Sequence, residues 1–267
     1  MTPPSPPPGE TEATPSVANP FASPGVGSLY HRGRPFHHPR SLARVQAIVG
    51  DAPVDRAIDL ACGTGMSTVA LADVAGFVVG VDASLEMLRA ARQAPNCAYL
   101  FAHAEALPFP DGSFDAATCC SGVHWFDQER FFAELRRVLR PGAWVGLYDH
   151  YFLGEMIDVP EFAEWTRIAL ERYPLPPRNP QVGDPRSLAP VGFEAVDDEF
   201  FTDDIQMTRE QFADYQLTIS TFVAAAERGT PREELRAWLL ASTAPLFAGV
   251  ETRGVRFLGS ITCSLRT

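Results

Sequence analysis

The stretch Arg56–Asp82 decides the fold, and it reads RAIDLACGTGMSTVALADVAGFVVGVD. A short apolar run ends in a turn with two glycines, Gly63 and Gly65, and an apolar segment with helical spacing follows the turn. A second apolar run closes at Asp82. Strand, glycine turn, helix and strand in this order are typical of a βαβ unit, whose parallel strands are buried on both faces. The expected elements are a strand at 56–60, a helix at 66–75 and a strand at 77–81.

Outward from this unit, apolar runs and helical segments keep alternating. Ser84 is suited to cap a helix that runs through Arg92, because its hydroxyl can accept a bond from a backbone N–H of the first turn. Pro141 and Gly142 are expected to end a later helix. The alternation predicts an α/β fold with a Rossmann-like, doubly wound sheet. Its further elements are helices at 41–49 and 129–139 and strands at 98–102, 114–120 and 143–148.

The C-terminal part is less regular and contains helices that interrupt a pair of strands. Because these helices fall between the strands, we expect them to form a lid over one end of the sheet. The predicted domain covers 28–267, with helical insertions at about 155–190 and 205–250. Its late elements are helices at 160–173, 208–228 and 231–246 and strands at 193–201 and 253–265.

Residues 1–27 differ in kind from the rest of the chain. They are rich in Pro, Ser and Thr and contain few apolar side chains, which predicts a disordered tail. The segment has neither the basic start nor the apolar stretch of a secretory signal, so a cytoplasmic location is expected.

Composition excludes several classes of protein. The 267 residues carry 33 acidic and 22 basic side chains, and every basic one is Arg. Without Lys there is no Schiff base and no P-loop. The net charge of -11 argues against a nucleic-acid partner. No apolar run approaches about 18 residues, so no membrane span is expected. The composition does not indicate an oligomeric state.

The cysteines and histidines do not predict a metal centre. The chain has 5 cysteines and no C-x-x-C pair, which argues against a disulfide framework and a structural zinc site. Cys119 and Cys120 are expected to fill the interior of a strand. His31, His37 and His38 lie close in sequence, but no carboxylate is spaced to complete a site with them, so no metal is predicted.

Ligands of open α/β sheets bind beyond the carboxyl ends of the strands. Asp59 lies just before the glycine turn, where it would repel a pyrophosphate but not a cationic ligand. Asp82 can accept both hydroxyls of a ribose, which fits an adenosine cofactor and NAD equally. Thr68 stands where the dinucleotide fingerprint has its third glycine, and this counts against NAD.

Several motifs occur as an ordered set. They are DLACGTG (59–65), GVDASLEM (80–87), AEALPFPDGSFD (104–115), HWFD (124–127) and RRVLRPGA (136–143). Over roughly residues 40–150 the set resembles class I S-adenosylmethionine-dependent methyltransferases, and within them most resembles the type 11 methyltransferase domain. HWFD, the late helical insertion and YHRGRPFHHP (30–39) are similar to the trans-aconitate methyltransferase-like branch. The resemblance implies a seven-stranded sheet with its last strand antiparallel.

The same resemblance implies that S-adenosylmethionine is the cofactor and S-adenosylhomocysteine the product. The turn from Asp59 to Gly65, with Ala61 and Gly63, would hold the methionine part of the cofactor. Asp82 would hold the ribose.

The adenine contacts are implied in the same way. Ala83 and Met87 would flank the ring, and Ala104 and Glu105 would meet its polar edge. His103 stands where relatives often carry Asp, which leaves open which side chain contacts the adenine amino group.

The remaining implied residues surround the methyl group. Ser121 would lie beside the sulfonium, and Tyr30 and Arg34 would close over the cofactor carboxylate. His124 and His150 follow strands on the same edge of the sheet and are the candidate catalytic bases. A base is needed only when the acceptor atom carries a proton, so a carboxylate acceptor would need none.

The leading hypothesis is O-methylation of a small molecule at a carboxylate or hydroxyl. Arg34, Arg178 and Arg253 are candidate clamps for an acid. Three alternatives stay open: a carbon or nitrogen methyltransferase, a protein of secondary metabolism that binds S-adenosylmethionine without transferring methyl (a cyclase or a noncatalytic subunit), and an NAD-dependent oxidoreductase.

Overall fold

The computed structural model describes residues 21, 23–175 and 192–267; residues 1–20 and 22 of the predicted tail, and Arg178, lie outside them. The described chain forms a seven-stranded sheet in the order β3-β2-β1-β4-β5-β7-β6. β3, β2, β1, β4 and β5 are parallel, and β7 is antiparallel to both its neighbours, which confirms the expected fold class. The strands are β1 (Arg56–Leu60), β2 (Phe77–Asp82), β3 (Cys97–Phe101), β4 (Phe114–Cys120), β5 (Leu139–Met156), β6 (Phe193–Thr208) and β7 (Thr252–Arg266).

Helices cover both faces of the parallel strands. α5 (Gln128–Val138) packs on one face through Phe131 and Leu135, both fully buried. α2 (His38–Val49) and α3 (Met66–Leu71) pack on the other face. α3 is shorter than the predicted helix at 66–75. α4 (Leu85–Arg89) begins at the expected Ser84 cap, whose hydroxyl accepts the Met87 N–H at 3.2 Å, but it ends before Arg92.

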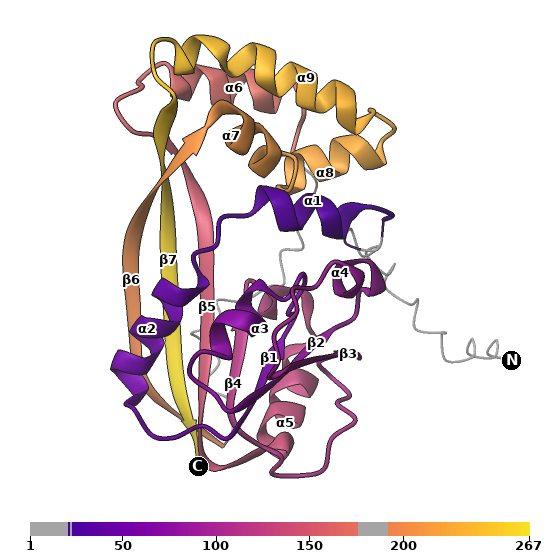
Figure 1. Ribbon diagram of the computed structural model, residues 1–267, viewed down its shortest axis with the longest axis vertical. Coiled ribbons are helices and arrows are strands. Elements are labelled where there is room, and N and C mark those ends of the chain that lie inside the picture. The colour runs from indigo at the N-terminus through magenta and orange to yellow at the C-terminus, as the bar shows by residue number, and fades with distance from the viewer. Residues whose placement is uncertain (1–20, 22, 176–191) are drawn as a thin grey trace, which may run out of the picture.

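Three strands continue far beyond the parallel layer. β5, β6 and β7 have 18, 16 and 15 residues and run from that layer to a second layer of helices (Figure 1). The strands expected at 143–148 and 193–201 are therefore too short. The outer half of β6 alternates half-buried and exposed residues and includes the acidic pair Asp203 and Asp204, so no apolar run marks it.

The second layer is a cap with its own hydrophobic core, which confirms the predicted lid. Phe162, Phe212 and Leu235 are at most 1% exposed inside it. One continuous helix at 208–228 is wrong: the chain breaks at 217–219, where the Thr218 hydroxyl donates back to the Tyr215 carbonyl at 2.6 Å. No described helix has the length and apolar character needed to cross a membrane. The cap helices are α6 (Phe162–Arg172), α7 (Arg209–Gln216), α8 (Ser220–Glu227) and α9 (Arg232–Thr243).

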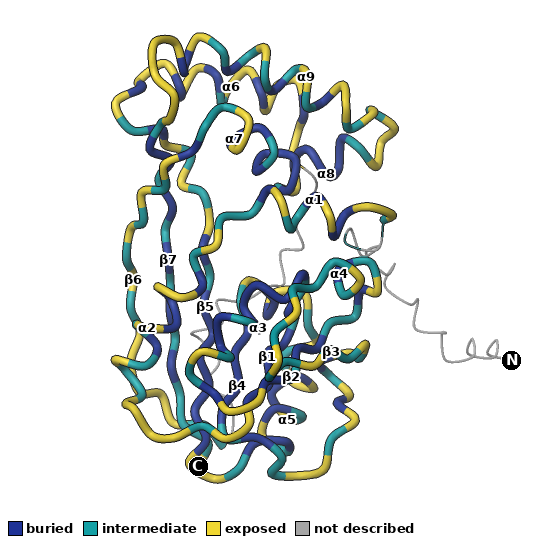
Figure 2. Tube along the Cα trace, in the orientation of Figure 1, coloured by how far each residue is buried: buried dark blue, intermediate teal, exposed yellow. Residues whose placement is uncertain are grey.

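A short helix, α1 (Val26–Gly33), lies between the cap and the parallel layer (Figure 1). Two glycines allow this close fit. A Cβ on Gly27 would lie 2.3 Å from the carbonyl oxygen of Glu86 in α4, and one on Gly33 would lie 2.4 Å from that of Asp214 in α7. α1 starts before the predicted domain boundary at 28, and its Val26 is buried. Figure 2 shows buried stretches along α1. The helix therefore joins the two layers.

We expect Gly33→Ala to lower the free energy of unfolding by about 1–3 kcal/mol, because the new methyl group would press on a backbone carbonyl. This steric cost should outweigh the gain in helix propensity. Urea denaturation measures the change, and Ser28→Ala, exposed on the same helix, is the control, with a change below about 0.5 kcal/mol. Equal stability of the two variants would contradict the docking of α1 on α7.

Candidate active site

A buried carboxylate, that of Asp59, supports the turn after β1. Asp59 has no exposed surface, and its Oδ2 accepts the hydroxyls of Ser67 at 2.6 Å and Thr68 at 2.7 Å. Its Oδ1 accepts the hydroxyl of Thr118 on β4 at 2.8 Å. Asp59 thus ties β1 to α3 and to the neighbouring strand.

This placement changes the role expected for Asp59. Its side chain is enclosed by three hydroxyls beneath the turn, so it shapes the turn rather than facing a ligand above it. Burial raises the pKa of Asp59 to about 6, although the three hydroxyl hydrogen bonds act in the opposite direction.

The turn itself adopts left-handed backbone. Gly63 has φ 55° and Gly65 φ 71°, and Ala61 has φ 52° although it is not a glycine. A left-handed non-glycine residue is strained, and such residues cluster at functional sites. Ser121, at the end of the adjacent β4, has φ 52° as well. The two non-glycine residues therefore mark the gap between β1 and β4, where the strand order reverses.

Asp82, at the end of β2, accepts a hydrogen bond from the same turn. Its Oδ2 accepts the Gly63 N–H at 2.8 Å, and its Oδ1 accepts the Ser84 N–H at 2.8 Å. Burial raises the pKa of this carboxyl group, and the two backbone hydrogen bonds oppose the shift. Each oxygen keeps a further lone pair, so the carboxylate can still accept two hydroxyl groups of a ribose.

Apolar side chains line the neighbouring strand ends. Met87 and Ala104 are 6% and 5% exposed, and a Cβ on Gly63 would lie 3.2 Å from the Met87 methyl group. Ala83, at the end of β2, is half-buried. Glu105 is partly engaged, because its Oε1 accepts the backbone N–H of Asp127 at 3.1 Å. One carboxylate oxygen of Glu105 thus serves the start of α5 rather than a ligand.

A cavity of about 190 Å³ opens beside Ser121. His124 and Asp149 line it together with Tyr151 and Phe200. The cavity lies at the carboxyl end of β4 and beside the middle of β5, and residues of β7 and β6 complete its lining. It therefore joins two predicted residues, Ser121 and His124, at one opening.

Arg34 brings a positive charge to the contact between the end of α1 and the cap. Its Nη2 donates to the Tyr30 hydroxyl and to the Thr218 carbonyl, both at 3.1 Å. The guanidinium carbon lies 4.8 Å from the ring centre of Tyr30 and 5.4 Å from that of Tyr215. Its Nε is enclosed without a hydrogen-bond partner. Within the described residues, no carboxylate forms an ion pair with Arg34.

Phe21, before α1, contacts residues that follow β2 and β4, and the sequence did not predict this contact. The Phe21 ring lies 5.4 Å from that of Tyr30 and 5.6 Å from that of Trp125, after β4. The Ser84 hydroxyl, after β2, donates to the Phe21 carbonyl at 2.6 Å. The one sequence feature that could have indicated this contact is an aromatic residue, Phe21, in a Pro-rich segment.

His150 is buried rather than open to the cavity. Its ring stacks between those of His37, at 3.9 Å, and Phe257, at 4.7 Å. Its Nε2 lies 3.4 Å from Asp203 Oδ2. Burial lowers the pKa of His150 to about 4, and the Asp203 carboxylate opposes this shift. The ring is neutral near pH 7, with both faces covered.

The other described candidate clamp, Arg253, lies near the start of β7. The Arg253 Nε donates to the Leu246 carbonyl at 2.9 Å where β7 meets the cap. Of the candidate clamps among the described residues, Arg34 is therefore the one that lies between α1 and the cap.

Residues 58–147 match a methyltransferase domain family. An uncharacterised methyltransferase of Mycobacterium tuberculosis (strain H37Rv) is 39% identical over 119 residues, 44% of this chain and 47% of that protein. The demethylmenaquinone methyltransferase of Renibacterium salmoninarum is 41% identical over 96 residues, 35% of this chain and 40% of that protein. The chain spans about half the length, or less, of these relatives.

A solved structure covers more of the chain. A provisionally assigned type II methyltransferase from Anaeromyxobacter dehalogenans superposes with a TM-score of 0.64 at 27% identity, over 84% of this chain and 95% of that one. The strand order and the position of the turn at the reversal point agree with the resemblance to class I S-adenosylmethionine-dependent methyltransferases. The chain carries the methyltransferase domain at residues 58–147, and S-adenosylmethionine is the cofactor of this class. The Asp82 carboxylate and the turn at Gly63 fit the ribose and the adjoining chain of that cofactor.

Asp59 and Asp82 should separate stability from cofactor binding. We expect Asp59→Asn to lower the free energy of unfolding by about 1–3 kcal/mol, because an amide nitrogen cannot accept a buried hydroxyl. Asp82→Asn should instead weaken S-adenosylhomocysteine binding by about tenfold or more, since a ribose acceptor is lost. Urea denaturation and calorimetric titration measure the two effects. The reverse pattern would contradict the assigned roles.

Acid should destabilise the fold through His150. Between pH 6.5 and about 4 the unfolded chain binds a proton there that the folded chain does not, so stability falls as pH falls through this window. His150→Gln should reduce the pH slope of the unfolding free energy by up to about 1.4 kcal/mol per pH unit. Asp59 contributes to the pH slope of the unfolding free energy with the opposite sign. This contribution is the same in the wild-type protein and in His150→Gln, so it cancels when the two slopes are compared. Identical slopes would show that His150 is protonated normally in the folded chain.

Proposed function

We propose that this chain transfers the methyl group of S-adenosylmethionine to an oxygen atom of a small anionic acceptor that Arg34 holds. The observation that carries the proposal is the environment of Arg34. Its charge is half-buried between two aromatic rings, its Nε has no partner, and no described carboxylate pairs with it. A buried charge without a counter-charge is costly, so a ligand anion is expected there.

The geometry around Arg34 supports an acceptor with a carboxylate. A guanidinium offers two parallel donors that match the two oxygens of a carboxylate. One Arg34 nitrogen is already engaged by Tyr30 and by Thr218 of the cap, which fixes the plane of the group. The chain as a whole has a net charge of -11, so affinity for an anion depends on local cations such as this one.

The chemistry asks little of the protein beyond alignment. The cofactor supplies an activated methyl group, and an acceptor oxygen attacks the methyl carbon in line with the carbon–sulfur bond. The carbon–oxygen bond forms as the carbon–sulfur bond breaks, and its electron pair stays on sulfur to give S-adenosylhomocysteine. Orientation of this kind supplies about 7–11 kcal/mol. An ionised carboxylate releases no proton, so no base is required.

A hydroxyl acceptor would need a proton acceptor. His124 lines the cavity beside Ser121, whereas His150 is stacked on both faces. We therefore assign the base role, for an acceptor that carries a proton, to His124. His150 would act as a packed support for the loop that carries Arg34 and His37.

The relatives favour a small acceptor. The name of the Renibacterium salmoninarum protein gives demethylmenaquinone, a small molecule, as its methyl acceptor. The acidic composition also disfavours nucleic acid. A carboxylate acceptor is consistent with the trans-aconitate methyltransferase-like resemblance of residues 30–39.

The test is a panel of small carboxylic acids with methyl-labelled S-adenosylmethionine. We expect Arg34→Gln to lower kcat/KM for the accepted acid by about 10²-fold, mainly through KM, because a charged hydrogen-bond pair is lost. Arg32→Gln, exposed on α1 two residues before Arg34, is the control. The affinity for S-adenosylhomocysteine should be equal in both variants.

Two outcomes would overturn the proposal. A loss of S-adenosylhomocysteine affinity in Arg34→Gln that accounts for the whole defect would assign Arg34 to the cofactor carboxylate instead. Binding of S-adenosylmethionine without label transfer to any member of a broad acid, hydroxyl, amine and carbon acceptor panel would favour a protein that binds the cofactor without transferring methyl.

A further inference from the structure

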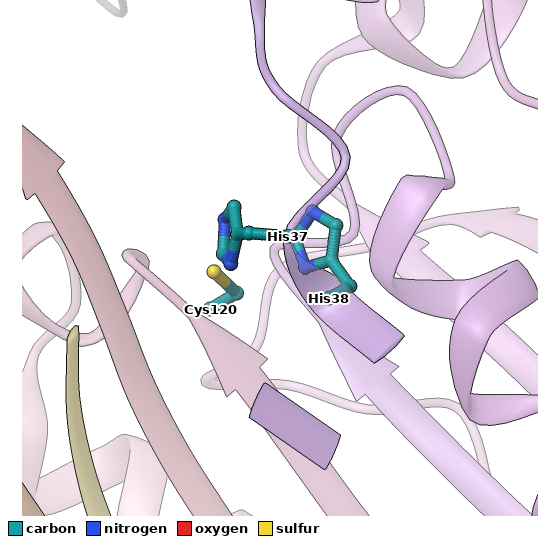
Figure 3. Close-up of side chains that lie close together, drawn as sticks. All are labelled: His37, His38 and Cys120. Atoms are coloured by element: carbon teal, nitrogen blue, oxygen red, sulfur yellow. The ribbon is translucent and has the colours of Figure 1, made fainter. Parts of the chain in front are cut away.

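Three side chains with metal-ligating atoms meet where α2 begins. His37 and His38 stand at the start of α2, and Cys120 is the last residue of β4. Each offers one ligand atom, and these atoms lie within 4.8 Å of one another. Figure 3 shows the Cys120 sulfur next to the ring of His37, with the ring of His38 beside it. The fold thus joins two segments far apart in the sequence.

The spacing is close to that of a metal site. With zinc–nitrogen bonds of about 2.0–2.1 Å and a zinc–sulfur bond of about 2.3 Å, tetrahedral ligand atoms lie roughly 3.3–3.7 Å apart. Contraction from the present separations needs shifts of roughly 1 Å, within reach of small side-chain rotations. Two imidazoles and one thiolate form a donor set that suits zinc among the common divalent ions, since magnesium and calcium prefer oxygen.

The surroundings hold the rings in place. His37 stacks on His150 at 3.9 Å, and its Nδ1 lies 3.3 Å from the Ser41 hydroxyl. The Nδ1 of His38 lies 3.0 Å from the Tyr148 hydroxyl. Fixed rings lower the entropic cost of collecting ligands, and neighbours of this kind tune metal sites.

Burial has opposite effects on the two kinds of ligand: it favours the neutral imidazole that binds zinc and disfavours the thiolate. Burial lowers the pKa of His37 far below its usual range and that of His38 to about 3, so both rings are neutral, as ligands must be. Burial raises the pKa of the Cys120 thiol, and the nearby Asp149 carboxylate acts in the same direction. A divalent cation would offset the negative electrostatic potential of the Asp149 carboxylate. Its binding would displace the thiol proton to solvent, forming one zinc–sulfur bond for each proton released.

We propose that His37, His38 and Cys120 bind a zinc ion through three protein ligands, with the fourth position open to water or an exogenous ligand. Three ligands and one open position are the arrangement of zinc sites that exchange ligands. The sequence did not predict this site, because Cys120 belongs to a strand and no metal-ligating partner stands near the two histidines in the sequence. The inference is independent of the proposed methyl transfer, which needs no metal.

The experiment uses cobalt(II) as a spectroscopic probe of the full chain. After dialysis against a chelator, we expect about one equivalent of Co²⁺ to give tetrahedral d–d bands and a thiolate-to-cobalt charge-transfer band, which one equivalent of Zn²⁺ abolishes. Cys120→Ser should remove the charge-transfer band. His37→Gln should weaken binding by about 10²-fold or more, beyond the loss typical of an outer neighbour.

Controls separate ligation from misfolding. Cys97→Ser changes a thiol on β3, outside the cluster, and should keep the bands unchanged. Thermal stabilisation by S-adenosylhomocysteine reports whether each variant is folded. Asp82→Ala should abolish this stabilisation and leave the cobalt bands unchanged. A folded wild-type chain without the charge-transfer band, or an unchanged band in Cys120→Ser, would show that the three side chains only pack together.

Discussion

A buried carboxylate, that of Asp59, is the constraint on which the site depends. It is surrounded by the hydroxyls of Ser67, Thr68 and Thr118, which link β1, α3 and β4 at one point. With this point fixed, the turn above it can hold left-handed residues and present the Gly63 N–H to Asp82. The two acidic residues therefore have different tasks: one is buried to shape the turn, and the other remains available at its surface.

The second constraint is the length of β5, β6 and β7. Because these strands extend past the parallel layer, they carry the cap as a continuation of the same sheet rather than as a separate domain (Figure 1). β6 pairs with β7 from Phe193 to Thr208, so the sheet is continuous from the parallel layer to the cap. α1 adds a second connection on the open side. The cap is thus connected to the parallel layer by a continuous sheet on one side and by a small helix on the other.

The parallel half of the fold could be predicted because burial on both faces leaves a simple signal. The strands at 56–60 and 114–120 agree with the structure residue for residue. The outer half of β6 could not be predicted, because a half-exposed strand with acidic residues such as Asp203 has a sequence pattern that is typical of a loop. Asp82 and the glycine turn were predictable from their position after strands. The stacking of His37 on His150 was not, because only the packing of α2 on β5 brings these residues together.

The failed helix prediction at 208–228 coincides with the site, and this has a physical reason. A continuous helix would use the Thr218 carbonyl in its own hydrogen bonds. The break at 217–219 frees that carbonyl to accept Arg34, while the Thr218 hydroxyl closes the end of α7. Arg34 therefore connects the loop after α1 to the cap through a single side chain. An anion that pairs with Arg34 would also fix the position of the cap relative to the cofactor turn, so recognition of the acceptor and alignment for transfer would be one event.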